Sequence, residues 1–353
     1  MMTNLRFTEQ PLSEWMSREG RESDIVISSR VRIARNMLQH PFPMLSTNRQ
    51  SEEVLEQLRQ ALTDEQFEAY GPLHPLLLTD LDELDKRVLV EKHLISPNLA
   101  TDSRNGAAFI SEDESLSIMI NEEDHLRIQC LYPGLQIQEA WEKATEIDDI
   151  FEAHVDYAFD DHRGYLTSCP TNVGTGLRAS VMMHLPALVL TQQIGRILSA
   201  VSQVGLTVRG IYGEGSETQG NLFQISNQIT LGQSEAEIIE NLYGVVLQII
   251  QHEKTAREKL ITESRPRMLD RVMRSYGTLS HAFIIDSKEA AQRLSDVRLG
   301  VDLGLIDNVS AQTLNELNVL TQPGFLQKKF NNGMSPAERD MYRAKLIRER
   351  MGN

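Results

Sequence analysis

The sequence predicts an α+β fold in which an antiparallel sheet flanked by helices is followed by a smaller domain made only of helices. Two observations lead to this prediction. Apolar and polar side chains alternate along residues 115–121 (SLSIMIN), and only three acidic residues separate this run from the apolar run 107–111 (AAFIS), which is hairpin spacing. After Ser234, apolar residues recur at helical spacing, interrupted by Gly and by Asn or Asp.

The remaining elements follow in chain order. Strand-like runs are expected at 87–92 (RVLVEK), 125–131 (HLRIQCL), 164–169, 205–212 and 221–229, and helices at 136–158 and 187–204. The sequence pattern becomes helical after Ser234, and we place the domain boundary near residues 251–259. We therefore predict a first domain of residues 1–255 and a helical C-terminal domain of residues 256–353.

Charge and composition exclude several classes of protein. The 353 residues carry a net charge of −15, which argues against general nucleic-acid binding, although residues 254–353 alone carry +5. Cys130 and Cys169 are the only cysteines, so a disulfide framework is not expected. The first ten residues lack an apolar segment and no run approaches a membrane span, so we expect a cytoplasmic protein without membrane contact.

Arginines, and not a glycine-rich loop, are the candidate phosphate ligands. The chain has no GxxxxGK[ST], no H-R-D with D-F-G, and no GxGxxG after a strand. In the segment 28–36 (SSRVRIARN), Arg30 and Arg32 share one face if the chain is extended. Two guanidinium groups on one face suit a polyphosphate.

Three further motifs accompany this one: 121–127 (NEEDHLR), 169–180 (CPTNVGTGLRAS) and 209–214 (RGIYGE). Together the four resemble the phosphagen kinase family, from about Ser28 to about Glu235. The resemblance implies an ATP-dependent kinase of guanidinium groups that works with Mg²⁺ held mainly through ATP. The nucleotide site that it implies comprises Ser28, Ser29, Arg30, Val31, Arg32, His93, Arg127, Arg178, Ala179, Ser180, Val181, Met182, Arg209, Gly210, Ile211, Tyr212 and Gly213.

The same resemblance implies three catalytic residues. Glu123 matches the carboxylate that grips the substrate guanidinium, Glu214 a second one, and Cys169 the active-site cysteine. A guanidinium has a pKa above about 12, so its nitrogen attacks only when a carboxylate aligns it and accepts its proton. Glu122 is interpreted as scaffold and His125 as structural. Cys169 is either catalytic or a redox switch, and the alternative for a lone cysteine is a small buried apolar residue.

Departures from the family pattern bear on the substrate. Kinases of free creatine or arginine carry a helical domain ahead of the SSRVR motif, whereas only 27 residues precede Ser28 here, and Met182 stands where those enzymes have His. The whole chain resembles the bacterial protein-arginine kinase branch of the family. An open site is expected for an arginine side chain on another protein.

The C-terminal segment contains a second motif that resembles the phosphoarginine-binding motif of that branch, formed by Arg339, Asp340, Arg343 and Ala344. Ser335 and Glu338 predict a capping box that starts a helix there. Arg339 and Arg343 are four residues apart, a like-charge pair that an anion would relieve. The alternative is a solvated helix on which Asp340 pairs with Arg343.

The resemblance also implies partners: a homodimer formed through the helical tail, a small zinc-binding activator, and a Clp unfoldase or protease for which stress regulators or misfolded proteins are marked. Two other functions stay open. One is a kinase of free arginine or another small guanidino compound. The other is a non-catalytic phosphoarginine-binding adaptor.

Overall fold

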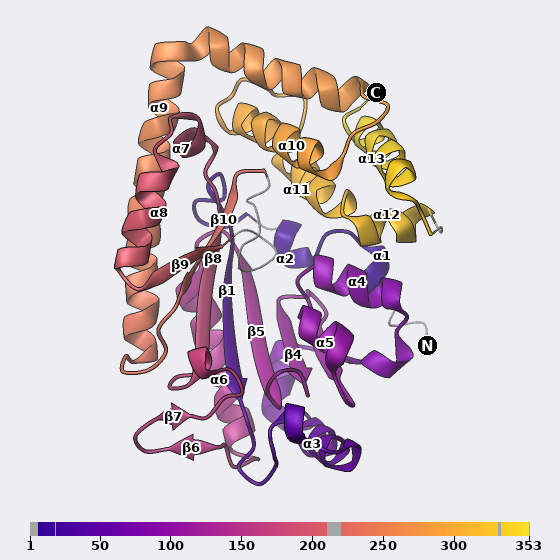
Figure 1. Ribbon diagram of the computed structural model, residues 1–353, viewed down its shortest axis with the longest axis vertical. Helices are drawn as coiled ribbons and strands as arrows, with labels where there is room; N and C mark the ends of the chain where they lie inside the picture. Colours follow the sequence, from indigo (N-terminus) through magenta and orange to yellow (C-terminus); the bar gives the residue numbers. More distant parts are fainter. Residues whose placement is uncertain (1–5, 18, 210–219, 331–332, 353) are drawn as a thin grey trace.

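The computed structural model describes residues 6–17, 19–209, 220–330 and 333–352 (Figure 1). Its centre is an eight-stranded antiparallel sheet with the order β2-β3-β4-β5-β1-β8-β10-β9, and β6 and β7 form a separate small hairpin. The strands are β1 Val26–Arg35, β2 Leu73–Leu77, β3 Ala107–Ser111, β4 Leu116–Ile120, β5 Leu126–Pro133, β6 Phe159–Asp160, β7 Gly164–Tyr165, β8 Leu177–His184, β9 Leu206–Arg209 and β10 Leu222–Asn227.

Helices surround this sheet and form the whole C-terminal part beyond one end of it (Figure 1). They are α1 Arg6–Glu9, α2 Glu14–Ser17, α3 Asn48–Ala61, α4 Glu83–Glu91, α5 Pro97–Asp102, α6 Ile137–Glu152, α7 Pro186–Leu190, α8 Ile194–Gln203, α9 Glu235–His281, α10 Ser287–Asp302, α11 Ala311–Leu320, α12 Pro323–Phe330 and α13 Pro336–Arg350. This arrangement confirms the predicted fold class. None of the helices in the described parts of the chain combines the length and apolar character that crossing a membrane requires.

The two faces of the sheet differ. The main core lies on the face against which α6 and α9 pack, and it contains Val31, Ile33, Ala179 and Val181 from the central strands. On the other face, a smaller apolar cluster under α4 and α5 covers β3 and β4. Among the described residues, the central strands β5, β1, β8 and β10 therefore have one face that neither apolar cluster covers.

Residues 87–92 do not form the strand that was predicted. They lie mostly in α4, which begins after Asp82, where the Asp82 side chain accepts a hydrogen bond from the backbone N–H of Asp85. The helix buries Val88 and Leu89 against the sheet and α12. Capping and tertiary packing thus outweigh the local β preference of a Val-Leu-Val run.

Three other predicted elements are shorter than expected. The helix predicted at 136–158 is α6, which ends at Glu152. The helix predicted at 187–204 is split into α7 and α8, because Gln192 between them adopts a positive φ of 59° that no helix can contain. Of the strand predicted at 164–169, only Gly164 and Tyr165 form a strand, β7. The strand runs predicted at 107–111, 115–121, 125–131, 205–212 and 221–229 correspond to β3, β4, β5, β9 and β10 within the residues described.

The predicted domain boundary lies inside a helix. α9 is 47 residues long and bends at Ser264, where φ is −145° and ψ is 25°. Pro266 explains the bend, since a proline inside a helix lacks the N–H donor and its ring clashes with the preceding turn. The sheet core takes residues from α9 as far as Ala256, and the separate C-terminal core begins at Met268.

A buried ion pair joins β1 to α6. Arg35 is 2% exposed, its Nε and Nη2 both donate to Asp148 Oδ2 at 3.0 and 2.5 Å, and its Nη1 donates to the carbonyl of Thr175 at 2.8 Å. The guanidinium also lies 3.4 Å from the ring centroid of Tyr165. Arg35 thus holds the loop that leads into β8.

We expect Arg35→Ala to lower the free energy of unfolding by about 3–5 kcal/mol, because it leaves the Asp148 carboxylate buried without its partner. Urea denaturation measures this change. The control is Arg49→Ala, which breaks the exposed pair with Glu53 and should cost less than about 1 kcal/mol. Equal losses in the two variants would contradict the structural role given to Arg35.

Candidate active site

The strand register gathers Arg30, Arg32, Arg127 and Arg178 on the face of the sheet opposite the main core. Arg32 in β1 lies directly opposite Arg178 in β8, and Arg30 lies opposite Ser180. On the other side of β1, Ala34 lies opposite Arg127 in β5. Residues opposite each other in antiparallel strands point to the same face, and so do residues two apart. Arg209 ends β9, where its backbone pairs with Gln224 of β10.

Four residues predicted to bind the nucleotide have side chains on the other face, so those side chains do not reach the arginine face. The side chains of Val31, Ala179 and Val181 are fully buried in the main core. The Ser29 hydroxyl donates to the carbonyl of Gly134 at 2.8 Å. Strand side chains alternate between faces, so only every second residue of each motif can reach the arginine face.

The arginines repel one another across this face. Burial, followed by the charges of Arg178 and Arg127, lowers the pKa of Arg30 to about 10. Burial and the neighbouring charges of Arg30, Arg127 and Arg178 also bring the pKa of Arg32 well below its ordinary value. Among the described residues, no group accepts a hydrogen bond from the buried Nε of Arg32. A polyanion would relieve the repulsion and supply the missing acceptors.

Two carboxylates hold Arg127. Glu122 Oε1 accepts from Arg127 Nη1 at 2.8 Å and from the Ser96 hydroxyl at 2.5 Å, and its side chain is fully buried. Glu123 Oε2 accepts from Arg127 Nη2 at 3.2 Å, but the Glu123 side chain remains 33% exposed. Burial raises the pKa of Glu123. Glu122 therefore acts as scaffold for Arg127, whereas Glu123 can still contact a ligand.

The residues that follow Glu123 fix its loop. Asp124 Oδ1 accepts from the Asn36 amide at 2.6 Å and from the Ser168 backbone N–H at 2.7 Å. His125 is buried, and burial lowers its pKa to about 4, so it is neutral near pH 7. Its Nδ1 accepts from the backbone N–H of Met37 at 3.1 Å. These contacts fit the structural role interpreted for His125.

Of the other two predicted catalytic residues, the structure describes Cys169 but not Glu214. Cys169 is partly exposed at the start of the loop before β8, with its Sγ 3.0 Å from Thr171 Oγ1. Its role stays a prediction. Glu214 and the nucleotide residues Gly210, Ile211, Tyr212 and Gly213 lie outside the described residues.

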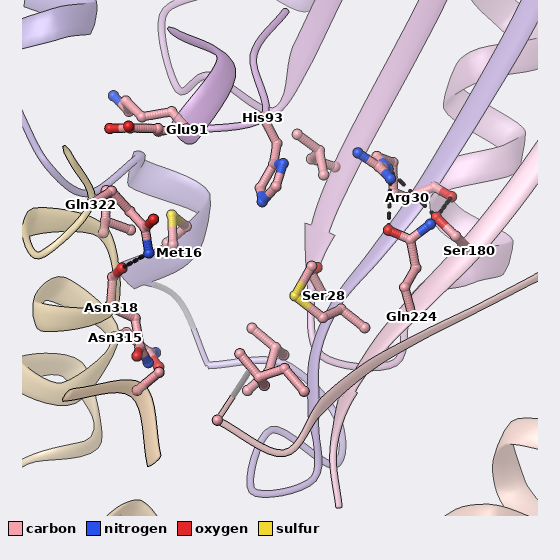
Figure 2. Close-up of a pocket in the computed structure, with 18 residues that line it drawn as sticks. Met16, Ser28, Arg30, Glu91, His93, Ser180, Gln224, Asn315, Asn318 and Gln322 are labelled. Atoms are coloured by element: carbon pink, nitrogen blue, oxygen red, sulfur yellow. Dashed lines mark hydrogen bonds between the residues drawn. The ribbon is translucent and has the colours of Figure 1, made fainter. Parts of the chain in front are cut away.

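A cavity begins at Arg30 and extends toward the C-terminal helices (Figure 2). Five predicted nucleotide residues line it, namely Ser28, Arg30, His93, Ser180 and Met182. Across the cavity lie Asn315, Asn318 and Gln322, polar residues on and just after α11. Burial and the charges of Arg30 and Arg32 lower the pKa of His93 to about 3, so this imidazole is neutral.

Two further cavities lie beyond Arg30 on the same face of the sheet, beside Arg32 and Glu123. The smaller, of about 20 Å³, is bounded by Arg32, Arg127 and Arg178 together with Asn172 and Gly176. The larger, of about 330 Å³, contains Glu123 in its wall; its other lining residues are Pro43, Met44, Ser51, Asn98, Asp102, Arg104, Asn121, Glu122 and Ser168. The site thus runs along β1 from Ser28, past the arginines, to Glu123.

The predicted phosphoarginine motif lies on α13, which begins with the expected capping box at Ser335. The Arg343 guanidinium is buried and already donates to Asp340 Oδ1 at 2.5 Å and to the carbonyls of Thr321 and Ile285. The pairing of Asp340 with Arg343, which the sequence left as an alternative, is therefore present. Asp340 and the two carbonyls therefore offset the repulsion between Arg339 and Arg343 without a bound anion.

The Ala344 side chain is buried in the C-terminal core, so of the predicted motif it is the part least able to contact a ligand directly. Sequence reasoning also missed residues that belong to the site. Gln224 accepts from Arg30 Nη2 at 2.9 Å, and Asn315, Asn318 and Gln322 face the cavity of Figure 2 from the other domain. No motif marks these residues, since the fold alone brings them there.

Residues 49–256 match the family described as ATP:guanido phosphotransferase, C-terminal catalytic domain, and residues 265–353 match the protein-arginine kinase McsB C-terminal domain. The protein-arginine kinase of Brevibacillus brevis is 60% identical over 350 residues, which span 99% of this chain and 98% of the relative. The protein-arginine kinase of Bacillus subtilis is 55% identical over 350 residues, 99% of this chain and 96% of the relative.

Solved structures show the same fold at low identity. A lombricine kinase superposes with a TM-score of 0.57 at 22% identity, over 69% of this chain and 70% of that chain. A duplicated taurocyamine kinase from Schistosoma mansoni superposes with a TM-score of 0.60 at 19% identity, over 83% of this chain and 49% of that chain.

Arg32→Ala should abolish stabilisation of the protein by ATP. In the unchanged protein, ATP at 100 times its Kd should add about 2.7 kcal/mol to the free energy of unfolding. The variant without ATP should unfold at the same or a higher temperature, because one repelling charge has gone. Thermal unfolding with and without ATP measures both effects. Arg21→Ala, which removes an exposed arginine, is the control and should respond to ATP normally.

Proposed function

The chain belongs to the ATP:guanido phosphotransferase family, and within it to the protein-arginine kinases, and we propose that it transfers the γ-phosphoryl group of ATP to arginine side chains of other proteins. The observation that carries this proposal is the line of arginines on one face of the sheet, which ends beside the partly exposed carboxylate of Glu123. Cations for a polyphosphate and a carboxylate for a guanidinium thus meet in one site.

We place ATP along β1. Ser28 and Ala34 are six residue steps apart along the strand, a span of about 20 Å. The adenosine would occupy the cavity of Figure 2, between His93 and Met182 on one side and the amides of α11 on the other. The phosphates would then lie over Arg30, Arg32 and Arg178. The γ-phosphate would reach Arg127, which Glu122 and Glu123 hold in position.

In the proposed transfer, Glu123 orients the substrate guanidinium and takes its proton. A nitrogen of that group forms a bond to the γ-phosphorus, the bond from phosphorus to the β,γ-bridging oxygen breaks, and ADP leaves. Positioning and electrostatic stabilisation account for most of the catalysis of such transfers. The fixed arginines supply the stabilisation with little reorganisation, because Glu122 and the strands already hold them.

Mg²⁺ is expected to neutralise part of the phosphate charge when it accompanies ATP. Within residues 6–17, 19–209, 220–330 and 333–352, no group of three or more His, Cys, Asp or Glu is placed to hold a metal ion. We therefore propose that the ion is held mainly by the phosphates. Glu214, matched to a second carboxylate of the family, is proposed to share the orientation of the guanidinium with Glu123.

We also propose that two copies associate through the C-terminal helices. Phe283 and Ile284, between α9 and α10, and Met341 on α13 are large apolar side chains that are 79%, 66% and 55% exposed. Exposed apolar clusters of this kind are typical of interfaces. The family resemblance supports three further proposals: a phosphoarginine site at Arg339 and Arg343, a small zinc-binding activator, and marking of stress regulators or misfolded proteins for a Clp protease.

Activity should fall at low pH because of Glu123. The carboxylate must be ionised to accept the proton, and burial raises its pKa above the ordinary 4.5. The acid limb of kcat/KM against pH should therefore have an apparent pKa above 4.5. Circular dichroism at each pH checks that the enzyme remains folded. A profile that stays flat down to pH 4.5 would exclude Glu123 as the proton acceptor.

The activity itself is tested by incubating a denatured basic protein with the enzyme and ATP and reading phosphate on arginine by mass spectrometry. The unchanged enzyme should label the protein, and Glu123→Gln should reduce labelling by at least about 100-fold while still binding ATP. Glu56→Gln, an exposed change on α3, is the matched control. Turnover of free arginine alone would favour a metabolite kinase, and absence of any transfer would favour a non-catalytic adaptor.

A further inference from the structure

Three large apolar side chains stand exposed on one short segment beside the acceptor end of the site. Leu38, Met44 and Leu45 are 61%, 74% and 74% exposed, and all three lie within one stretch of eight residues. The segment follows β1 and precedes α3, at the end of the sheet opposite the C-terminal helices (Figure 1). Clusters of solvent-exposed apolar side chains are typical of interaction surfaces.

The segment that carries them is firmly held. His125 accepts from the backbone N–H of Met37 through Nδ1, and its Nε2 donates to the carbonyl of Pro41 at 3.0 Å. The Ser46 hydroxyl donates to the carbonyl of Pro41 at 2.6 Å, and Arg104 donates to the carbonyl of Ser46. The exposure of Met44 and Leu45 therefore belongs to a fixed loop, and His125, two residues after Glu123, ties that loop to the catalytic segment.

The exposed loop and the candidate catalytic carboxylate share a cavity. Pro43 and Met44 line the same 330 Å³ cavity as Glu123, whose walls also include Glu122 and Asp102. Glu123 and Asp102 suit a cationic side chain entering the cavity, whereas Glu122 is already paired with Arg127, and Arg104, which also lines the cavity, donates to the carbonyl of Ser46. The apolar rim suits uncharged side chains beside it. A ligand that matches both features carries a guanidinium on a chain whose neighbouring residues are apolar.

We propose that Leu38, Met44 and Leu45 form a docking surface for apolar side chains that flank the target arginine in an extended segment of the protein substrate. This inference rests on the proposed function and names its substrate class. A folded protein buries most large apolar residues, so a segment that offers an arginine between exposed apolar neighbours comes from an unfolded region. The surface thus selects unfolded polypeptide without reading a defined sequence.

The geometry of an extended substrate peptide fits the arrangement of the cavity and the exposed apolar side chains. Successive side chains of an extended peptide point to opposite sides, so when an arginine enters the cavity its nearest neighbours on the same side are two residues away, about 7 Å along the chain. Those neighbours, and the peptide backbone, would lie at the rim where Met44 and Leu45 are exposed. Free arginine has no such neighbours and would gain nothing from the rim.

The test uses two unstructured peptides of equal length and charge with one central arginine, flanked either by Leu and Phe or by Ser and Gly. The full-length enzyme should phosphorylate the apolar-flanked peptide with a kcat/KM about tenfold higher. In the double variant Met44→Ser with Leu45→Ser, this ratio should fall to about one. The KM for ATP should not change.

The matched control is the double variant Val204→Ser with Leu247→Ser, which removes two exposed apolar side chains on α9 and after α8. It should keep the tenfold preference. A preference that is absent in the unchanged enzyme, or kept in the Met44 and Leu45 variant, would overturn the docking surface. A changed oligomeric state in that variant with an unchanged preference would assign the surface to a second copy of the chain, which also overturns it.

The two hypotheses fail in different ways. If neither peptide receives phosphate on arginine, the proposed function fails, whatever the role of the rim. If both peptides are phosphorylated equally well, the enzyme is a protein-arginine kinase and only the docking surface is refuted. Arginine-free peptides provide a second readout, because the apolar one should inhibit the unchanged enzyme competitively and the double variant at least fivefold less.

Discussion

The register of β1 between β5 and β8 is the constraint on which the site depends. Because the three strands are antiparallel and aligned, Arg32, Arg178 and Arg127 point to one face while Val31 and Ala179 point into the core. A slip of one residue would bury the cations and expose the core. Packing of the apolar face therefore fixes the position of the arginine face. The free energy gained by burying the apolar side chains offsets the repulsion between the arginines.

The same strand orders the site from end to end. Its first residues lie near the C-terminal helices, and the chain that leaves it forms the loop beside Glu123 (Figure 1). The C-terminal domain packs against α4 near the cavity of Figure 2, since Glu91 accepts from the backbone N–H groups of Gly324 and Phe325 at 2.7 and 3.1 Å. Arg343 donates to the carbonyl of Thr321, whose neighbour Gln322 lines the cavity of Figure 2, so the motif on α13 adjoins that cavity.

Local patterns failed where tertiary contacts decide. The run 87–92 has the composition of a strand, but a cap at Asp82 and packing of Val88 make it helical. The SSRVR motif includes residues of both faces, and only the sheet shows that the Ser29 hydroxyl donates to the carbonyl of Gly134 on the face away from the arginines. Conversely, the assignment of Glu122 as scaffold followed from alternation along the chain, and its burial against Arg127 and Ser96 agrees with it.

By itself, the sequence determined the fold class, the family and the chemical types of the groups in the site, because motifs record which side chains a reaction needs. Tertiary structure decided which of those side chains face one another. Asn318 and Gln322 line the same cavity as Arg30 and His93. Met44 lines the same cavity as Glu123, and His125 holds the loop that carries Met44. Such proximity depends on packing between distant segments, which no local pattern encodes.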